Sequence, residues 1–143
     1  MNMDDRPMQE QIIHQEVIDI LKKSIYNYPN ATHPNLITFT NHPIKSKIIT
    51  DLQGNEYHPD IIIISSLTNK VIMIGEVETE SSLNIIELPQ WQAYAKLSPT
   101  FYIYYPKGHY AQMHELCKIV PIAGFFEYRK EENRYTIARS YPC

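Results

Sequence analysis

Apolar residues recur at helical spacing near the start of the chain, at Ile13, Val17, Ile20 and Leu21. This pattern predicts an amphipathic helix over residues 8–23, with Pro7 suited to its first position. Weaker patterns of the same kind predict two further helices, over residues 87–97 and 109–118. The chain is therefore expected to place one helix before its strands and two between them.

Runs of β-branched and aromatic residues predict the strands. The two clearest are residues 60–66, rich in isoleucine, and residues 71–79, with a hairpin turn at residues 67–70. The other expected strand segments are 37–41, 44–51, 101–105, 124–129 and 134–139. This order predicts one α/β domain over residues 1–143, with a mixed central β-sheet flanked by helices.

Three acids lie on the two clearest strands: Asp60 begins the first strand, and Glu76 and Glu78 lie near the end of the second. Because side chains alternate along a strand, Glu76 and Glu78 share one face. In an antiparallel hairpin these acidic ends meet, which is costly unless a cation neutralises them. Oxygen ligands favour Mg²⁺ or Mn²⁺, so the sequence predicts a divalent metal site.

The register of this hairpin decides whether Asp60 joins the site. If the turn is centred between Thr68 and Asn69, Asp60 pairs with Val77 and faces away from the other two acids. A turn centred on either residue alone places Asp60 opposite Glu76 or Glu78. The metal site therefore requires a loop with an odd number of residues, or a β-bulge that restores the parity.

The segment His58-Pro59-Asp60, followed by Gly75-Glu76-Val77-Glu78, resembles the PD-(D/E)xK nuclease superfamily, which has the restriction-endonuclease-like fold. The element order fits that fold over most of the chain. The resemblance implies a hydrolase that is a magnesium- or manganese-dependent endonuclease or exonuclease. Its substrate would be nucleic acid, with DNA favoured. Asp60, Glu76 and the Val77 carbonyl would hold the metal ion.

Glu78 stands where the superfamily usually has lysine. Glu78 would then act as the base or as a second metal ligand, unless a lysine comes from elsewhere. Lys107 is the open candidate, because Lys96 projects away from Gln90 on the same helix. Gln90 itself resembles a residue of the helix that often follows this core.

The superfamily often adds an acid from the first helix. Glu10 and Glu16 both flank the apolar stripe of the expected helix. Glu10 is favoured because it lies at the beginning of the helix and is followed by His14 one turn later.

The formal net charge of −3 argues against a protein that coats nucleic acid by charge alone. It favours one alternative: a catalytically inactive module of the same fold that binds nucleic acid or a protein partner. A third reading is an unrelated α/β interaction module whose acids form only a surface edge. The sequence leaves open whether the chain forms a homodimer.

No apolar run approaches the length of a membrane helix, and the first residues carry no apolar signal-peptide core, so a cytoplasmic location is expected. The six histidines are scattered without a His-x-x-x-His pair, which gives little support to a zinc enzyme. Cys117 and Cys143 are expected to be reduced rather than joined.

Overall fold

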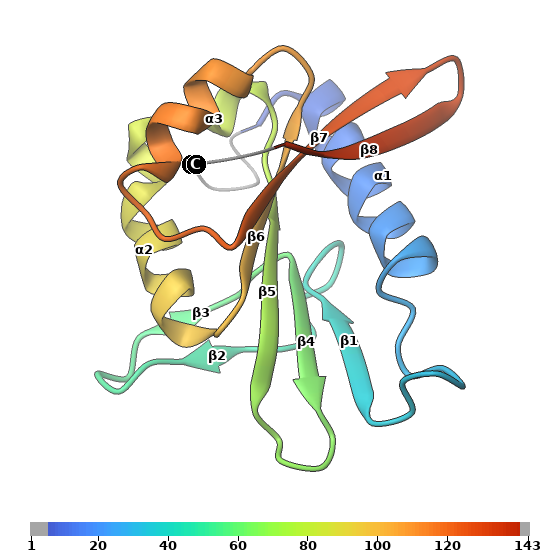
Figure 1. Ribbon diagram of the computed structural model, residues 1–143, viewed down its shortest axis with the longest axis vertical. Helices are drawn as coiled ribbons and strands as arrows, with labels where there is room; N and C mark the ends of the chain where they lie inside the picture. The colour runs from blue at the N-terminus through green and yellow to red at the C-terminus, as the bar shows by residue number, and fades with distance from the viewer. Residues whose placement is uncertain (1–5, 141–143) are drawn as a thin grey trace.

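The computed structural model describes residues 6–140 and shows a mixed β-sheet with helices on both faces (Figure 1). Its main elements are α1 (Met8–Ser24), β1 (Leu36–Thr40), β4 (Ile61–Ser65), β5 (Val71–Val77), α2 (Leu88–Leu97), β6 (Phe101–Pro106), α3 (Tyr110–Cys117), β7 (Gly124–Glu131) and β8 (Arg134–Ser140). Four short elements complete the described chain: β2 (Ile49–Thr50), β3 (Glu56–Tyr57) and the 3₁₀ turns η2 (Glu80–Ser82) and η3 (Ile85–Glu87). The predicted α/β class and mixed sheet are confirmed.

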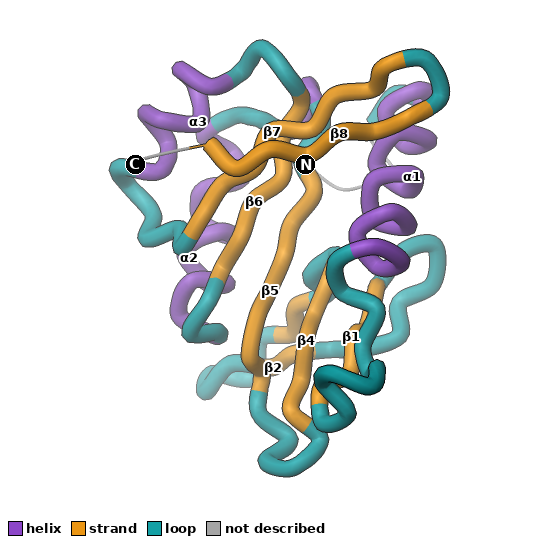
Figure 2. The backbone as a smooth tube through the Cα atoms, turned by 45° about the vertical axis from the view of Figure 1, so that its right-hand side comes forward, coloured by secondary structure: helices purple, strands orange, loops and turns teal. Residues whose placement is uncertain are grey.

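The six-stranded sheet has the order β1-β4-β5-β6-β7-β8. The strand β4 runs antiparallel to both of its neighbours, β1 and β5. The strands β5, β6 and β7 run parallel, and β8 returns antiparallel to β7. Parallel neighbours need a crossover, which α2 provides between β5 and β6 and α3 between β6 and β7. Both crossover helices lie on the face of the sheet opposite to α1, as Figures 1 and 2 show.

The isoleucine run is explained by burial of the sheet on both faces. Ile62 and Ile64 belong to the core cluster that contains Trp91 of α2, which we call the α2 core. Ile61 and Ile63 belong to the cluster that contains Val17 of α1, which we call the α1 core. The residues on each face of β4 therefore pack into one of two cores, which is why β4 does not alternate between apolar and polar residues.

The strand expected over residues 44–51 is mostly a loop, and only Ile49–Thr50 is extended. The side-chain oxygen of Asn41 accepts hydrogen bonds from the backbone N–H groups of Ser46 and Lys47, both at 2.8 Å. These bonds fold the chain back after β1 instead of extending the six-stranded sheet. The remaining two residues pair with β3 in a separate two-stranded sheet.

A β-bulge lies in the hairpin that carries the acids. Ile63 pairs with Met73, but Ile64 pairs with Val71, so Ile72 is an extra residue in β5. Beyond the bulge, Ile61 pairs with Gly75, and the same register places Asp60 opposite Glu76. The structure thus has the bulge that the metal-site hypothesis requires.

Deletion of Ile72 is expected to leave the protein folded and to cost only about 1 kcal/mol of stability. Val71 packs with the α2 core and Met73 with the α1 core, so removing the residue between them leaves a regular strand with every flanking pair unchanged. Thermal denaturation of the deletion variant measures this. Deletion of Gly75 is the matched comparison, because it moves Glu76 to the opposite face of the sheet. Equal losses of stability in the two variants would contradict the observed register.

Cys117 is buried in the α2 core and is disulfide-bonded, so the expectation of a reduced thiol is wrong for this residue. Sequence spacing carries no signal for a covalent contact made only by the tertiary fold. Cys143 lies outside the described residues. Within residues 6–140, no helix combines the length and the apolar character needed to cross a bilayer.

Candidate functional site

A cavity of about 710 Å³ opens beside the end of the hairpin that carries the acids. Residues of α1, the loop after β1, the strands β3 and β5, and the beginning of α2 line it. Its acidic lining residues are Glu56, Asp60, Glu76, Glu78 and Glu87, against the cationic Arg6 and Lys45. The cavity therefore favours a cation.

Asp60 and Glu76 are joined through the backbone. The N–H of Asp60 donates to Oε1 of Glu76 at 3.0 Å, and the N–H of Val77 donates to Oδ2 of Asp60 at 2.8 Å. Both acids are buried, Asp60 being 4% exposed. The register that the β-bulge sets therefore brings together the carboxylates of Asp60 and Glu76, which the sequence predicted to lie close to each other. The Val77 residue holds Asp60 through its N–H, whereas the resemblance implied a role for its carbonyl.

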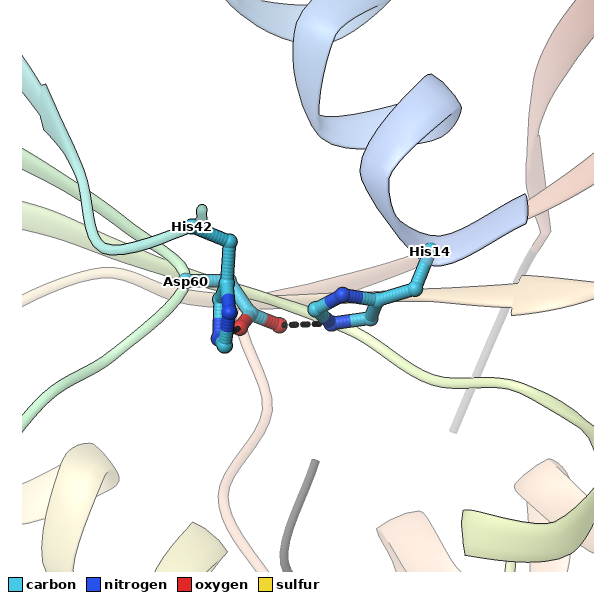
Figure 3. A group of neighbouring side chains, drawn as sticks. All are labelled: His14, His42 and Asp60. Carbon is cyan, nitrogen blue, oxygen red and sulfur yellow. Dashed lines mark hydrogen bonds and ion pairs between the residues drawn. The ribbon is translucent and has the colours of Figure 1, made fainter. Parts of the chain in front are cut away.

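Two histidines converge on Asp60 (Figure 3). Nε2 of His14 lies 3.1 Å from Oδ2, and Nε2 of His42 lies 3.0 Å from Oδ1. Burial alone would raise the pKa of Asp60, but the imidazoles of His14 and His42 outweigh burial and hold that pKa well below its usual range. Asp60 is therefore a carboxylate over the whole range in which proteins normally work.

Glu76 and Glu78 are in the opposite electrostatic situation. Burial, together with the negative charges of Asp60 and Glu78, raises the pKa of Glu76 well above its ordinary value. Burial raises the pKa of Glu78 to about 7, although a hydrogen bond from Ser82 and the charge of Arg6 act against the rise. Burial is the largest cause for both glutamates, and the negative charges of neighbouring carboxylates add to it.

Hydrogen bonds hold Glu78 at its side-chain carboxylate and at its backbone carbonyl. The indole N–H of Trp91 donates to Oε1 at 3.1 Å, and the hydroxyl of Tyr128 donates to the backbone carbonyl at 2.7 Å. Oε2 has no hydrogen-bond partner among the described residues, and the guanidinium of Arg6 lies 3.8 Å from it. Arg6 thus supplies a positive charge beside Glu78.

The two acids of the first helix do not line the cavity. Glu10 accepts hydrogen bonds from the N–H and the hydroxyl of Ser81, at 3.0 and 2.7 Å, and lines a second cavity of about 260 Å³. Glu16 accepts a hydrogen bond from the hydroxyl of Tyr135 at 3.0 Å. Lys107 also lines the second cavity. The structure therefore separates these residues from Asp60.

Gln90 does line the cavity that contains Asp60. Its side-chain amide donates to the hydroxyl of Tyr94 at 2.7 Å, which directs it along α2. Gln90 is exposed, so it lies at the rim rather than among the buried acids.

Sequence reasoning assigned no role in this site to Arg6, His42 and Glu87, and it used His14 only as a neighbour that favours Glu10. One signal was present for His14, because the buried face of α1 consists of His14, Val17, Ile18 and Leu21, which follow helical spacing. The apolar stripe expected from the sequence began at Ile13, one position before His14, and did not include the histidine. No local pattern marks His42, which reaches Asp60 only through the loop after β1.

No family model, curated protein or solved structure matches the chain. What the site can do is therefore inferred from its own residues and from the motif resemblance.

Proposed function

We propose that the protein is a divalent-metal-dependent nuclease of the PD-(D/E)xK type, which hydrolyses phosphodiester bonds in nucleic acid, with DNA as the favoured substrate. The observation that carries this proposal is the register set by the bulge at Ile72. That register puts Asp60 opposite Glu76, with Glu78 two residues further along, at a cavity open to substrate. The order helix, three antiparallel strands, helix and parallel strand supports the restriction-endonuclease-like fold.

The residues at the cavity fit a divalent cation. Asp60 and Glu76 offer buried carboxylate oxygens, and Oε2 of Glu78 is buried without a hydrogen-bond partner among residues 6–140. A bound cation would favour the ionised form of Glu76 and of Glu78, whose pKa values are raised by burial and by neighbouring negative charges. Oxygen donors of this kind suit Mg²⁺ or Mn²⁺.

A divalent ion at these carboxylates would polarise a phosphodiester and make water a better nucleophile. The chain's own residues would prepare the site for it. Asp60 is kept ionised and oriented by His14, His42 and the N–H of Val77. Lys45 also lines the cavity, where it could meet a phosphate oxygen of the substrate backbone.

The alternative function is a catalytically inactive module of this fold that binds nucleic acid or a protein partner. One observation favours it: both oxygens of Asp60 already have polar partners, at 3.1 Å or less. Those partners satisfy the carboxylate without a metal ion. Glu78 in place of the motif lysine points the same way.

A cleavage assay separates the two functions. The protein is incubated with labelled single-stranded, duplex and branched DNA and with RNA, in Mg²⁺, Mn²⁺ or EDTA. The proposal expects cleavage with a metal ion only, and its loss in Glu76→Gln, which keeps the shape of the side chain but removes its charge. Binding without cleavage under every condition would select the alternative.

A further inference from the structure

We propose that His14, His42 and Asp60 together form a site for a first-row transition-metal dication, in the series from Mn²⁺ to Zn²⁺, that Mg²⁺ and Ca²⁺ occupy poorly. This inference deepens the proposed function and rests on it in taking Asp60 as a metal ligand. It adds two nitrogen ligands that neither the motif nor the resemblance supplies.

The three side chains come from separate parts of the fold, and each is held in place. His14 lies on the buried face of α1 and is 1% exposed. His42 follows β1, where its neighbour Asn41 is tied to the Pro59 carbonyl at 2.6 Å. Asp60 comes directly before β4 and is held by Val77. Figure 3 shows the two rings approaching the carboxylate from different directions.

The separations suit a shared ion. One ligand atom from each of the three residues lies within 4.8 Å of the other two. Nε2 of His14 lies 3.1 Å from Oδ2 of Asp60, and Nε2 of His42 lies 3.0 Å from Oδ1, so each histidine faces its own oxygen of the carboxylate. An ion with bonds of about 2.1 Å holds adjacent ligand atoms roughly 3.0–3.4 Å apart. The two rings are nearly perpendicular to each other, at 86°, with their centroids 4.8 Å apart. Small side-chain movements would therefore admit an ion between them.

The surroundings also distinguish this trio from a closed structural cluster. His42 and Asp60 line the 710 Å³ cavity, so one side of the trio is open to water or substrate. A metal centre that does chemistry keeps such an open position. The acidic lining favours cations, and the N–H of Val77 orients the carboxylate in the way that outer hydrogen bonds orient metal ligands.

The donor set determines the class of metal. Two imidazole nitrogens and one carboxylate suit borderline transition-metal ions, whereas Mg²⁺ and Ca²⁺ prefer oxygen donors. Among residues 6–140, this trio is the one group of three or more His, Cys, Asp and Glu side chains whose ligand atoms converge in this way. Glu76, although hydrogen-bonded to the Asp60 backbone, is not part of that group.

Metal binding without nucleic acid tests the inference. The full chain, stripped with EDTA and dialysed, is titrated with Co²⁺, whose visible absorption reports nitrogen ligation, and by calorimetry with Zn²⁺, Mn²⁺ and Mg²⁺. The variants are His42→Ala, which alters a partly exposed side chain, and His14→Gln for the buried one. The matched control is His58→Ala, because His58 lines the same cavity but lies outside the trio. Circular dichroism confirms that each variant is folded.

The inference expects one Co²⁺ or Zn²⁺ ion per chain, binding at least about 10-fold tighter than Mg²⁺, with roughly 10- to 100-fold weaker binding in both trio variants and no change in His58→Ala. Equal binding of Mg²⁺ and Mn²⁺, unchanged in both trio variants, would overturn it while leaving the carboxylate site of the proposed nuclease intact. No binding of any ion would overturn both. Trio-dependent binding in a protein that cleaves no nucleic acid would keep the inference and overturn the proposed function.

Discussion

Replacing Asp60 by asparagine is expected to lower metal-dependent cleavage by at least about 100-fold. The substitution keeps the side-chain shape but removes a buried acid whose pKa is held low, so the proposed metal site loses its permanently charged ligand. It also leaves one of the two histidines facing an amide nitrogen instead of an oxygen acceptor. Initial rates on the substrate that the wild type cleaves best measure the effect.

Asp19→Asn is the matched control for this substitution. Asp19 lies on the exposed face of α1 and accepts a hydrogen bond from the side-chain amide of Gln15, so its variant should keep wild-type rates. Full activity in Asp60→Asn, with both variants folded, would remove Asp60 from the catalytic site.

Replacing Arg6 by methionine is expected to destabilise the metal-free protein at pH 8 by about 3 kcal/mol. Arg6 and Glu78 are both buried, and the guanidinium lies 3.8 Å from the carboxylate, so the variant leaves a buried negative charge without its cation. Urea denaturation in EDTA at pH 5 and pH 8 measures the loss.

The pH dependence of that loss follows from the raised pKa of Glu78, which is about 7 in the folded protein against 4.5 for an ordinary glutamate. A raised carboxyl pKa gives stability that is fully present below pH 4.5 and is lost as the pH rises through 7. Arg6 offsets that loss only where Glu78 is ionised. The cost of Arg6→Met should therefore be small at pH 5 and large at pH 8.

A double variant checks the assignment to Glu78. In a Glu78→Gln background, Arg6→Met should cost less and the cost should be nearly the same at both pH values. An equal and pH-independent loss in both backgrounds would show that Arg6 acts through packing and not through the carboxylate.

The elements of the fold that have a clear hydrophobic pattern could be predicted from the sequence. The run Ile61–Ile64 and the turn after it predicted a central hairpin, and the structure buries that hairpin on both faces. The position of the bulge could not be predicted, because Val71, Ile72 and Met73 are all apolar and any of them suits a paired position. The register was therefore open until the tertiary packing selected a face for Val71 and for Met73.

The candidate site shows the same limit: contacts within one hairpin could be predicted, and contacts made by tertiary packing could not. Asp60 and Glu76 could be paired from sequence because one hairpin carries both. His14 and His42 could not, because their approach to Asp60 depends on how α1 and the loop after β1 pack on the sheet. Glu10 shows the same limit: helical phase placed it beside the apolar stripe, but Ser81 rather than Asp60 lies within its reach.

The central claim is that Asp60 and its neighbours bind a divalent metal ion in the folded protein. Thermal denaturation of the wild type, Asp60→Asn and Glu76→Gln during a titration with Mn²⁺ tests it most directly. A ligand that binds only the native state stabilises it, so saturating Mn²⁺ should raise the melting temperature of the wild type by about 5 °C or more. Asp60→Asn, which lacks the ligand common to both proposed sites, should be nearly unchanged, whereas Glu76→Gln, which keeps the histidine trio, should show a smaller rise than the wild type. A wild-type melting temperature that does not respond to Mn²⁺ would contradict the account.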